Sequence, residues 1–179
     1  MARTRRRSLP RRKKREGNPS PYNWTPATEE ELDNIYNVHF KGVFFLTQKL
    51  LPLINDGGRI VNVSTARTRM IGPGGSVYAS MKGALEVLSK HMAKELGPRR
   101  IAVNVVAPGA TETDFSGGIV RDNPAVNKRV AEGTALGRAG VPDDVGRMIA
   151  SLLSEDNRWI NAERGYGWLR LSGPYTLAI

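Results

Sequence analysis

Two residues that could do chemistry together, Tyr78 and Lys82, lie four positions apart. If this stretch is helical, both side chains share one face, because residues at i and i+4 are neighbours on a helix. An ammonium group beside a phenol favours the phenolate and can lower the tyrosine pKa from about 10 by roughly 1–3. A phenol tuned in this way can act as a general acid or base near neutral pH. Alone the pair is weak evidence, because ordinary amphipathic helices carry the same spacing on their surface.

Hydroxyl groups at two other places strengthen this interpretation. Thr65 directly follows the β-branched run Arg59–Ser64, and Thr111 and Thr113 follow a second apolar run and the turn Pro108-Gly109. The carboxyl ends of parallel strands meet at one edge of a sheet, where open α/β sheets bind their ligands. We therefore expect a hydroxyl, a phenol, an amine and a Pro-Gly turn to converge on one crevice.

The elements that must position these groups are indicated by hydrophobic periodicity. Thr28 and Glu31 form a capping box, which starts a long helix with an apolar stripe. The sequence then predicts strands over 59–64 and 101–106, and helices over 76–96, near 123–132 and from Pro142 onward. Gly97-Pro98 is expected to end the helix at 76–96. The alternation of helices and strands predicts parallel strands with right-handed crossovers, an α/β fold.

Five stretches within residues 37–161 resemble the second half of a short-chain dehydrogenase/reductase. They are Asn37–Phe45, Arg59–Thr65, Tyr78–Ala84, Asn104–Gly109 and Leu136–Asp144. The resemblance implies a partial Rossmann-like, doubly wound parallel sheet of about three strands. It divides the chain into a disordered basic tail (1–24), a truncated Rossmann domain (25–161) and a divergent C-terminal segment (162–179).

The resemblance also implies a role for each matching residue. Tyr78 would exchange a proton with a carbonyl or alcohol oxygen of a small-molecule substrate, and Lys82 would tune Tyr78. Thr65 stands where the family has serine and keeps the hydroxyl that holds the substrate oxygen. His39 stands where the family usually has asparagine; it relays protons through water or simply packs against the sheet. His91 is expected on the surface.

The implied cofactor is NAD or NADP, with no metal. Its nicotinamide and pyrophosphate side would meet Lys82, Pro108, Gly109, Thr111 and Thr113. No Gly-x-Gly-x-x-Gly turn occurs in the sequence, and the residue that selects between NAD and NADP is not identifiable. A shifted reading frame or a truncated gene is one hypothesis for this pattern. The strand at 59–64 is then expected to expose one edge.

Charge and composition limit the other function classes. The net charge is +10, but residues 1–16 hold nine basic residues and one acidic residue, so the rest is nearly neutral. The chain has no cysteine, which excludes disulfides, thiolate metal sites and a cysteine nucleophile. No apolar run is long enough to span a bilayer, and no secretory signal is visible, so a cytoplasmic protein is expected.

Three functions remain open from the sequence. The first is an NAD(P)-dependent oxidoreductase. The second is a non-catalytic module, for which the resemblance implies a helix bundle that forms a homo-oligomer or pairs with a full-length relative. The third, ranked last because no base-reading motif accompanies it, is nucleic-acid binding through the basic residues 3–15.

Overall fold

The computed structural model of the protein describes residues 26–166. The sequence also predicts a short edge strand at Leu169–Leu171, which lies, like the predicted basic tail, outside the described residues. Within them the chain alternates helices and strands in the predicted order. The strands are β1 (Arg59–Val63), β2 (Ala102–Ala107) and β3 (Arg164–Tyr166). The α-helices are α1 (Glu29–Tyr36), α2 (Gly42–Leu50), α3 (Ser76–Glu95), α4 (Ile119–Asp122), α5 (Pro124–Gly133) and α6 (Pro142–Leu153).

The three strands form one parallel sheet in the order β1-β2-β3. Val63 of β1 is opposite Val106 of β2, and Val105 of β2 is opposite Arg164 of β3. All six residues of β2 are buried, because this strand is paired along both edges and covered on both faces. β1 is the edge strand of the described sheet, as predicted. The partial Rossmann-like α/β fold is therefore confirmed.

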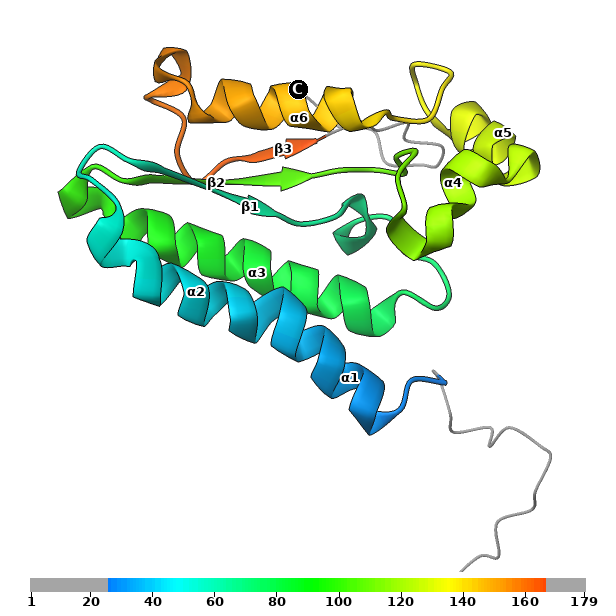
Figure 1. Cartoon of the computed structure of the whole chain (residues 1–179), viewed down its shortest axis with the longest axis horizontal. Coiled ribbons are helices and arrows are strands. Elements are labelled where there is room, and N and C mark those ends of the chain that lie inside the picture. The colour runs from blue at the N-terminus through cyan, green and yellow to red at the C-terminus, as the bar shows by residue number, and fades with distance from the viewer. Residues whose placement is uncertain (1–25, 167–179) are drawn as a thin grey trace, which may run out of the picture.

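Helices cover both faces of the sheet (Figure 1). α3 packs against one face with the α1–α2 helix outside it, and α6 lies over the opposite face. A core cluster of Met92, Ala93, Ile101 and Val103 joins α3 to β2, and Leu88 and Ile60 pack around it. On the other face, a β-carbon at Gly165 would lie only 3.5 Å from Met148 Sδ, so α6 approaches β3 closely. The layers are those of a doubly wound sheet.

The long N-terminal helix begins at the predicted capping box. Thr28 Oγ1 accepts a hydrogen bond from the Glu31 amide, and Glu31 accepts one from the Thr28 amide. The helix is not uniform, however: a π-helical segment, Asn37–Lys41, joins α1 to α2 without breaking the helical path. A short 3₁₀ turn at Leu51–Leu53, which contains Pro52, follows α2. Periodicity predicts the helix but not the wider turn inside it.

α3 ends just before Gly97-Pro98, as predicted, but the conformation of its cap differs from the expectation. Gly97 does not adopt a left-handed conformation; the chain tightens into a 3₁₀ turn at Gly97–Arg99, and Arg100 takes the positive φ of 56°. Further 3₁₀ turns lie at Ala66–Thr68, Phe115–Gly118 and Glu155–Asn157.

β3 lies beyond residue 161, in the segment that the sequence marked as divergent, and side chains clamp it to β2. Asn161 Oδ1 accepts a hydrogen bond from the Val103 amide at 2.9 Å. Asn104 donates to Ile160 O at 2.8 Å and accepts the Glu163 amide at 3.1 Å. Between these contacts Ala162 has a φ of 60°. Side-chain amides thus extend the ladder where the chain turns into β3.

Candidate active site

The structure brings together the four side chains proposed for catalysis. Thr65 follows β1, Tyr78 and Lys82 lie on α3, and His39 lies in the π-helical segment. The Thr65 side chain lies close enough to the Tyr78 hydroxyl to lower its pKa. Lys82 Nζ lies 5.9 Å from the Tyr78 ring centre, and the His39 ring meets the Tyr78 ring edge-on at 5.1 Å. The predicted convergence at the carboxyl edge of the sheet is therefore observed.

Thr65 is fixed at the point where the β1–β2 ladder ends. The Ser64 amide donates to Val106 O at 2.7 Å, and the Ala66 amide donates to Pro108 O at 2.9 Å. Thr65 lies between these two bonds, is buried, and starts the following 3₁₀ turn, where its Oγ1 accepts the Arg67 amide at 3.3 Å. Its hydroxyl is thus held by backbone on one side and by Tyr78 on the other.

The pKa of Tyr78 is raised rather than lowered, and Lys82 is not among the groups that shift it. Burial raises the pKa of Tyr78, and the hydrogen bond from Thr65 and the charge of Arg67 offset this only in part. Lys82 is itself buried, its Nζ donates to Val63 O at 2.7 Å, and burial lowers its pKa. The amine is therefore anchored to the strand end, and the loss of solvation outweighs any attraction that would favour a phenolate.

His39 is half-buried against α3 rather than against the sheet. Burial lowers its pKa, and the nearby charge of Lys82 lowers it further. The neutral imidazole that results near pH 7 can both donate and accept a hydrogen bond. His91 is exposed, as expected.

The residues proposed for the cofactor lie in the loop after β2, at the same edge. Pro108 O is bonded to the loop after β1, and Thr111 Oγ1 donates to Gly109 O at 3.2 Å. Thr113 Oγ1 accepts the Phe115 amide at 3.2 Å, which begins the turn that carries Phe115 to within 5.9 Å of the Tyr78 ring. This loop therefore borders the reacting groups.

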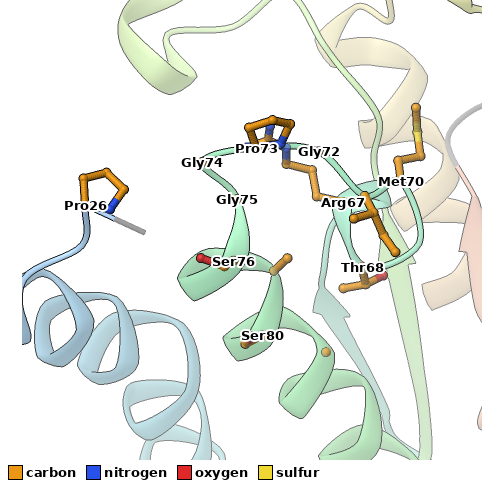
Figure 2. A pocket seen from close by; sticks show the side chains of 13 residues that line it. Pro26, Arg67, Thr68, Met70, Gly72, Pro73, Gly74, Gly75, Ser76 and Ser80 are labelled. Atoms are coloured by element: carbon orange, nitrogen blue, oxygen red, sulfur yellow. The ribbon is translucent and has the colours of Figure 1, made fainter. Parts of the chain in front are cut away.

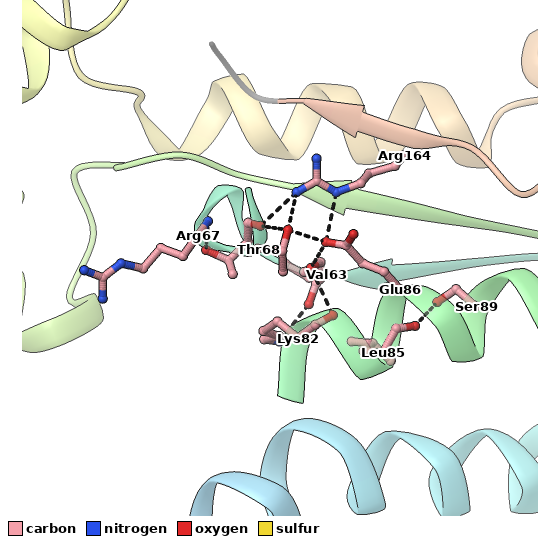
Figure 3. Close-up of polar contacts among 10 residues, drawn as sticks. Val63, Arg67, Thr68, Lys82, Leu85, Glu86, Ser89 and Arg164 are labelled. Atoms are coloured by element: carbon pink, nitrogen blue, oxygen red, sulfur yellow. Dashed lines mark hydrogen bonds and ion pairs between the residues drawn. The ribbon is translucent and has the colours of Figure 1, made fainter. Parts of the chain in front are cut away.

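The sequence interpretation missed a buried polar network behind Thr65 (Figure 3). Glu86 of α3 and Arg164 of β3 form an ion pair at 2.9 Å, and both contact the residues that follow β1. One signal was available: Glu86 follows Lys82 by four positions, as Lys82 follows Tyr78, so the three share a helix face. No comparable pattern marks Arg164.

A cavity of about 450 Å³ lies at the N-terminal end of α3 (Figure 2). The loop after β1 and the α3 residues Ala79, Ser80 and Gly83 line it. These three residues follow Tyr78 by one, two and five positions, which turns them roughly 100–200° away from the Tyr78 face. Tyr78 and Thr65 are not among the lining residues, so the cavity is separate from the reacting groups.

Known proteins identify the family. Residues 20–166 match the family profile described as Enoyl-(Acyl carrier protein) reductase, which covers well over half of the chain. This chain belongs to the short-chain dehydrogenase/reductase family.

Relatives of this short-chain dehydrogenase/reductase include an uncharacterized oxidoreductase of Methylorubrum extorquens. It is 39% identical over 139 residues, which are 76% of this chain and 55% of the relative. The promiscuous reductase LugOII, which catalyses keto-reduction at C1 during lugdunomycin biosynthesis, superposes with a TM-score of 0.75 at 39% identity. That match covers 80% of this chain and 56% of LugOII.

A third similar structure is the angucycline C-6 ketoreductase LanV with bound NADP. Its TM-score is 0.74 at 36% identity, and the match covers 79% of this chain and 54% of LanV. The chain thus spans about half the length of the relatives it matches. Within the part that the structure describes, no helix is long and apolar enough to cross a membrane.

Proposed function

We propose that this chain carries the catalytic portion of an NAD(P)-dependent ketoreductase, which interconverts a ketone and a secondary alcohol. The observation that carries the proposal is the convergence of Tyr78, Thr65 and Lys82 at the carboxyl edge of a parallel sheet. This edge is where α/β proteins of this class bind their ligands.

Tyr78 acts as the proton donor when the ketone is reduced. Because burial raises its pKa above the ordinary value of 10, the phenol is protonated at neutral pH. A protonated phenol can give its hydrogen to the oxygen that gains negative charge in the transition state. Thr65 holds that same oxygen through its hydroxyl, since its side chain already meets the Tyr78 hydroxyl.

Lys82 and His39 support Tyr78 from either side. Lys82 is anchored on Val63 O and leaves further N–H groups for a sugar hydroxyl. His39, neutral near pH 7, returns a proton to Tyr78 through water after each turnover.

The residues present fit the nicotinamide end of a dinucleotide. Lys82, Pro108, Gly109, Thr111 and Thr113 would hold it, because the loop after β2 borders Tyr78 through Phe115. When bound, NAD(P)H supplies the hydride. Within residues 26–166 no Gly-x-Gly-x-x-Gly turn offers a grip on the pyrophosphate. NADP is the first cofactor to test, because LanV holds it.

The substrate class follows from the same relatives. LugOII catalyses keto-reduction at C1 during lugdunomycin biosynthesis and LanV is an angucycline C-6 ketoreductase, so we assign a ketone on the fused ring system of an angucycline-like compound as the substrate of this site. The exposed Phe115 beside Tyr78 offers an aromatic surface to such a ring.

The test is NADPH oxidation by the purified chain with a bicyclic aromatic ketone. Tyr78→Phe should reduce turnover by about 10²–10⁴-fold and leave NADPH fluorescence titrations unchanged, because it removes only the proton donor. Thr65→Ser should keep activity, whereas Thr65→Val should lose it. Equal turnover by Tyr78→Phe and the parent chain would contradict the catalytic assignment.

A second candidate function is a non-catalytic docking module. The observation in its favour is apolar surface on the α1–α2 helix, where Val38 and Leu46 are 66% and 59% exposed and five further large apolar side chains are also exposed. The exposed side chains are those of Leu32, Tyr36, Val38, Phe44, Phe45, Leu46 and Leu50. Apolar area of this kind marks interaction sites. The partner is a second copy of the chain or a full-length relative.

Sedimentation distinguishes this candidate. The parent chain should sediment as a dimer, and Leu46→Glu should sediment as a monomer with unchanged circular dichroism. If the chain oxidises no NADPH but binds a full-length relative through this helix, the docking function replaces the enzymatic one.

A further inference from the structure

The buried ion pair of Glu86 and Arg164 makes contacts that converge on the end of β1 (Figure 3). Glu86 Oε1 accepts a hydrogen bond from Ser64 Oγ at 2.6 Å and lies 2.9 Å from Thr68 Oγ1. Arg164 Nη2 donates to Thr65 O at 2.9 Å and to Thr68 Oγ1 at 2.8 Å. Between residues 64 and 68 the pair bonds Ser64, Thr65 and Thr68, so its contacts lie on both sides of Thr65 and on Thr65 itself.

Stability alone does not account for the pair. The side chains of Arg164 and Glu86 are only 8% and 15% exposed. Removing two charges from water offsets much or all of their mutual attraction, so a well-packed apolar pair would serve the core equally well. The location is the distinguishing feature: a residue of β3 reaches past β2 to the end of β1.

Thr65 needs such support because the sheet does not hold its carbonyl. The backbone bonds on either side are made by the amides of Ser64, directed to Val106 of β2, and Ala66, directed to Pro108 just after β2. The Thr65 carbonyl instead accepts a hydrogen bond from Arg164 Nη2 at 2.9 Å and a longer one from the Thr68 amide at 3.3 Å, and it lies 3.1 Å from Thr68 Oγ1. Fixing this carbonyl fixes the peptide that follows Thr65, and with it the direction of the Thr65 hydroxyl.

We infer that Glu86 and Arg164 are positioning residues, which hold the Thr65 hydroxyl against Tyr78 by fixing the Thr65 carbonyl. The inference rests on the proposed function for its catalytic meaning, but its geometric content concerns the free protein. Neither residue touches Tyr78. Both act through Thr65 and Thr68.

The readout is the pKa of Tyr78, which the Thr65 hydrogen bond lowers. The other groups that face Tyr78 are Arg67 from the loop after β1, Lys82 from α3, and His39 and Phe115 from the elements packed around it. None of these is altered by a change at Glu86 or Arg164.

The experiment titrates the phenol absorbance of the full chain, with Tyr78→Phe subtracted in each background to isolate one of five tyrosines. The double variant Glu86→Gln/Arg164→Met removes both charges, so that no buried charge is left alone. We expect the Tyr78 pKa to rise by about 0.5–1, the effect of one lost hydrogen bond. The matched control is Arg59→Met/Glu155→Gln, which removes an ion pair at the opposite end of β1 and should leave the Tyr78 pKa unchanged.

A double-mutant cycle with Thr65→Val tests whether the ion pair affects Tyr78 through Thr65. Thr65→Val alone should raise the Tyr78 pKa by the same amount, and adding Glu86→Gln/Arg164→Met should change it no further. Additive effects, or an unchanged Tyr78 pKa in a folded double variant, would overturn the inference. Should the double variant not fold, Arg164→Lys gives the same test, because it keeps the charge but loses the planar fork whose Nε pairs with Glu86 while Nη2 reaches Thr65 and Thr68.

The titration separates this inference from the proposed function. It needs neither cofactor nor substrate, so a chain without turnover can still confirm the positioning role. If turnover is present, Glu86→Gln/Arg164→Met should lower kcat with little change in KM, whereas an inactive parent chain contradicts only the proposed function.

Discussion

β1 and β2 are neighbours in one sheet, yet they are held in different ways. β2 is paired along both edges, and all six of its residues are buried. β1 is paired along one edge in the described sheet, and its Val63 is 44% exposed while the opposite Val106 is fully buried. The reacting hydroxyl nevertheless follows β1. Beside the backbone bonds of Ser64 and Ala66, side chains of α3 and β3 contact this strand end, where a central strand would have a second neighbour.

The largest expected effect on this comparison comes from two valines that lie opposite each other on β1 and β2. Val106→Ala removes two methyl groups from a filled core and should lower the free energy of unfolding by about 2–3 kcal/mol. Val63→Ala, at the opposite position on β1, should cost less than about 1 kcal/mol, because its side chain is partly in water. Urea unfolding of both variants gives the comparison. Equal losses would mean that β1 is enclosed as fully as β2 in solution.

A second matched pair tests the buried asparagines of the two strands. Asn104 of β2 makes two hydrogen bonds to the segment before β3, and Asn62 of β1 makes one, to Ser89 Oγ at 2.8 Å. At about 1 kcal/mol per bond, Asn104→Ala should cost about 2 kcal/mol and Asn62→Ala about 1 kcal/mol. The same urea experiment measures both. A larger loss of unfolding free energy for Asn62→Ala than for Asn104→Ala would mean that β1 depends more on its buried asparagine than β2 does.

The smallest expected effect concerns pH and the site beside β1. Burial and Lys82 lower the pKa of His39 below its ordinary 6.5, so folding favours the neutral ring. The stability this provides is complete above about pH 6.5 and is lost as the pH falls towards the lowered value. Between pH 7 and 5, the melting temperature of His39→Asn should therefore depend less on pH than that of the parent chain.

The exposed His91 offers the control for that measurement. His91→Asn should reproduce the parent pH profile. If His91→Asn flattens the profile and His39→Asn does not, the packing of His39 on Tyr78 is not the cause.

Much of this arrangement was predictable from the sequence, and the reasons are local. The capping box at Thr28, the β-branched run before Thr65 and the spacing of Tyr78 and Lys82 each act over a few residues. They gave the helices, β1, β2 and the converging side chains correctly. The family resemblance supplied the roles, which remain proposals for this chain.

What the sequence did not predict depends on distant contacts. Glu86 and Arg164 are 78 positions apart, and no periodicity links them. β3 contains only Arg164, Gly165 and Tyr166, a composition without a clear strand signal; its place is set by the clamps from Asn104 and Asn161. The pKa direction of Tyr78 was missed because it depends on burial and on where the Lys82 amine is anchored, neither of which a spacing of four reveals.

The π-helical segment has a consequence for how this chain can change over evolutionary time. Such segments hold one more residue per turn than the α-helix around them, and each residue corresponds to about 100° of rotation. His39 lies inside the segment and meets Tyr78 edge-on. A one-residue deletion there would swing the imidazole off Tyr78 and re-orient everything on α1, while α3 and the sheet kept their places. At this position the number of residues matters as much as their identity.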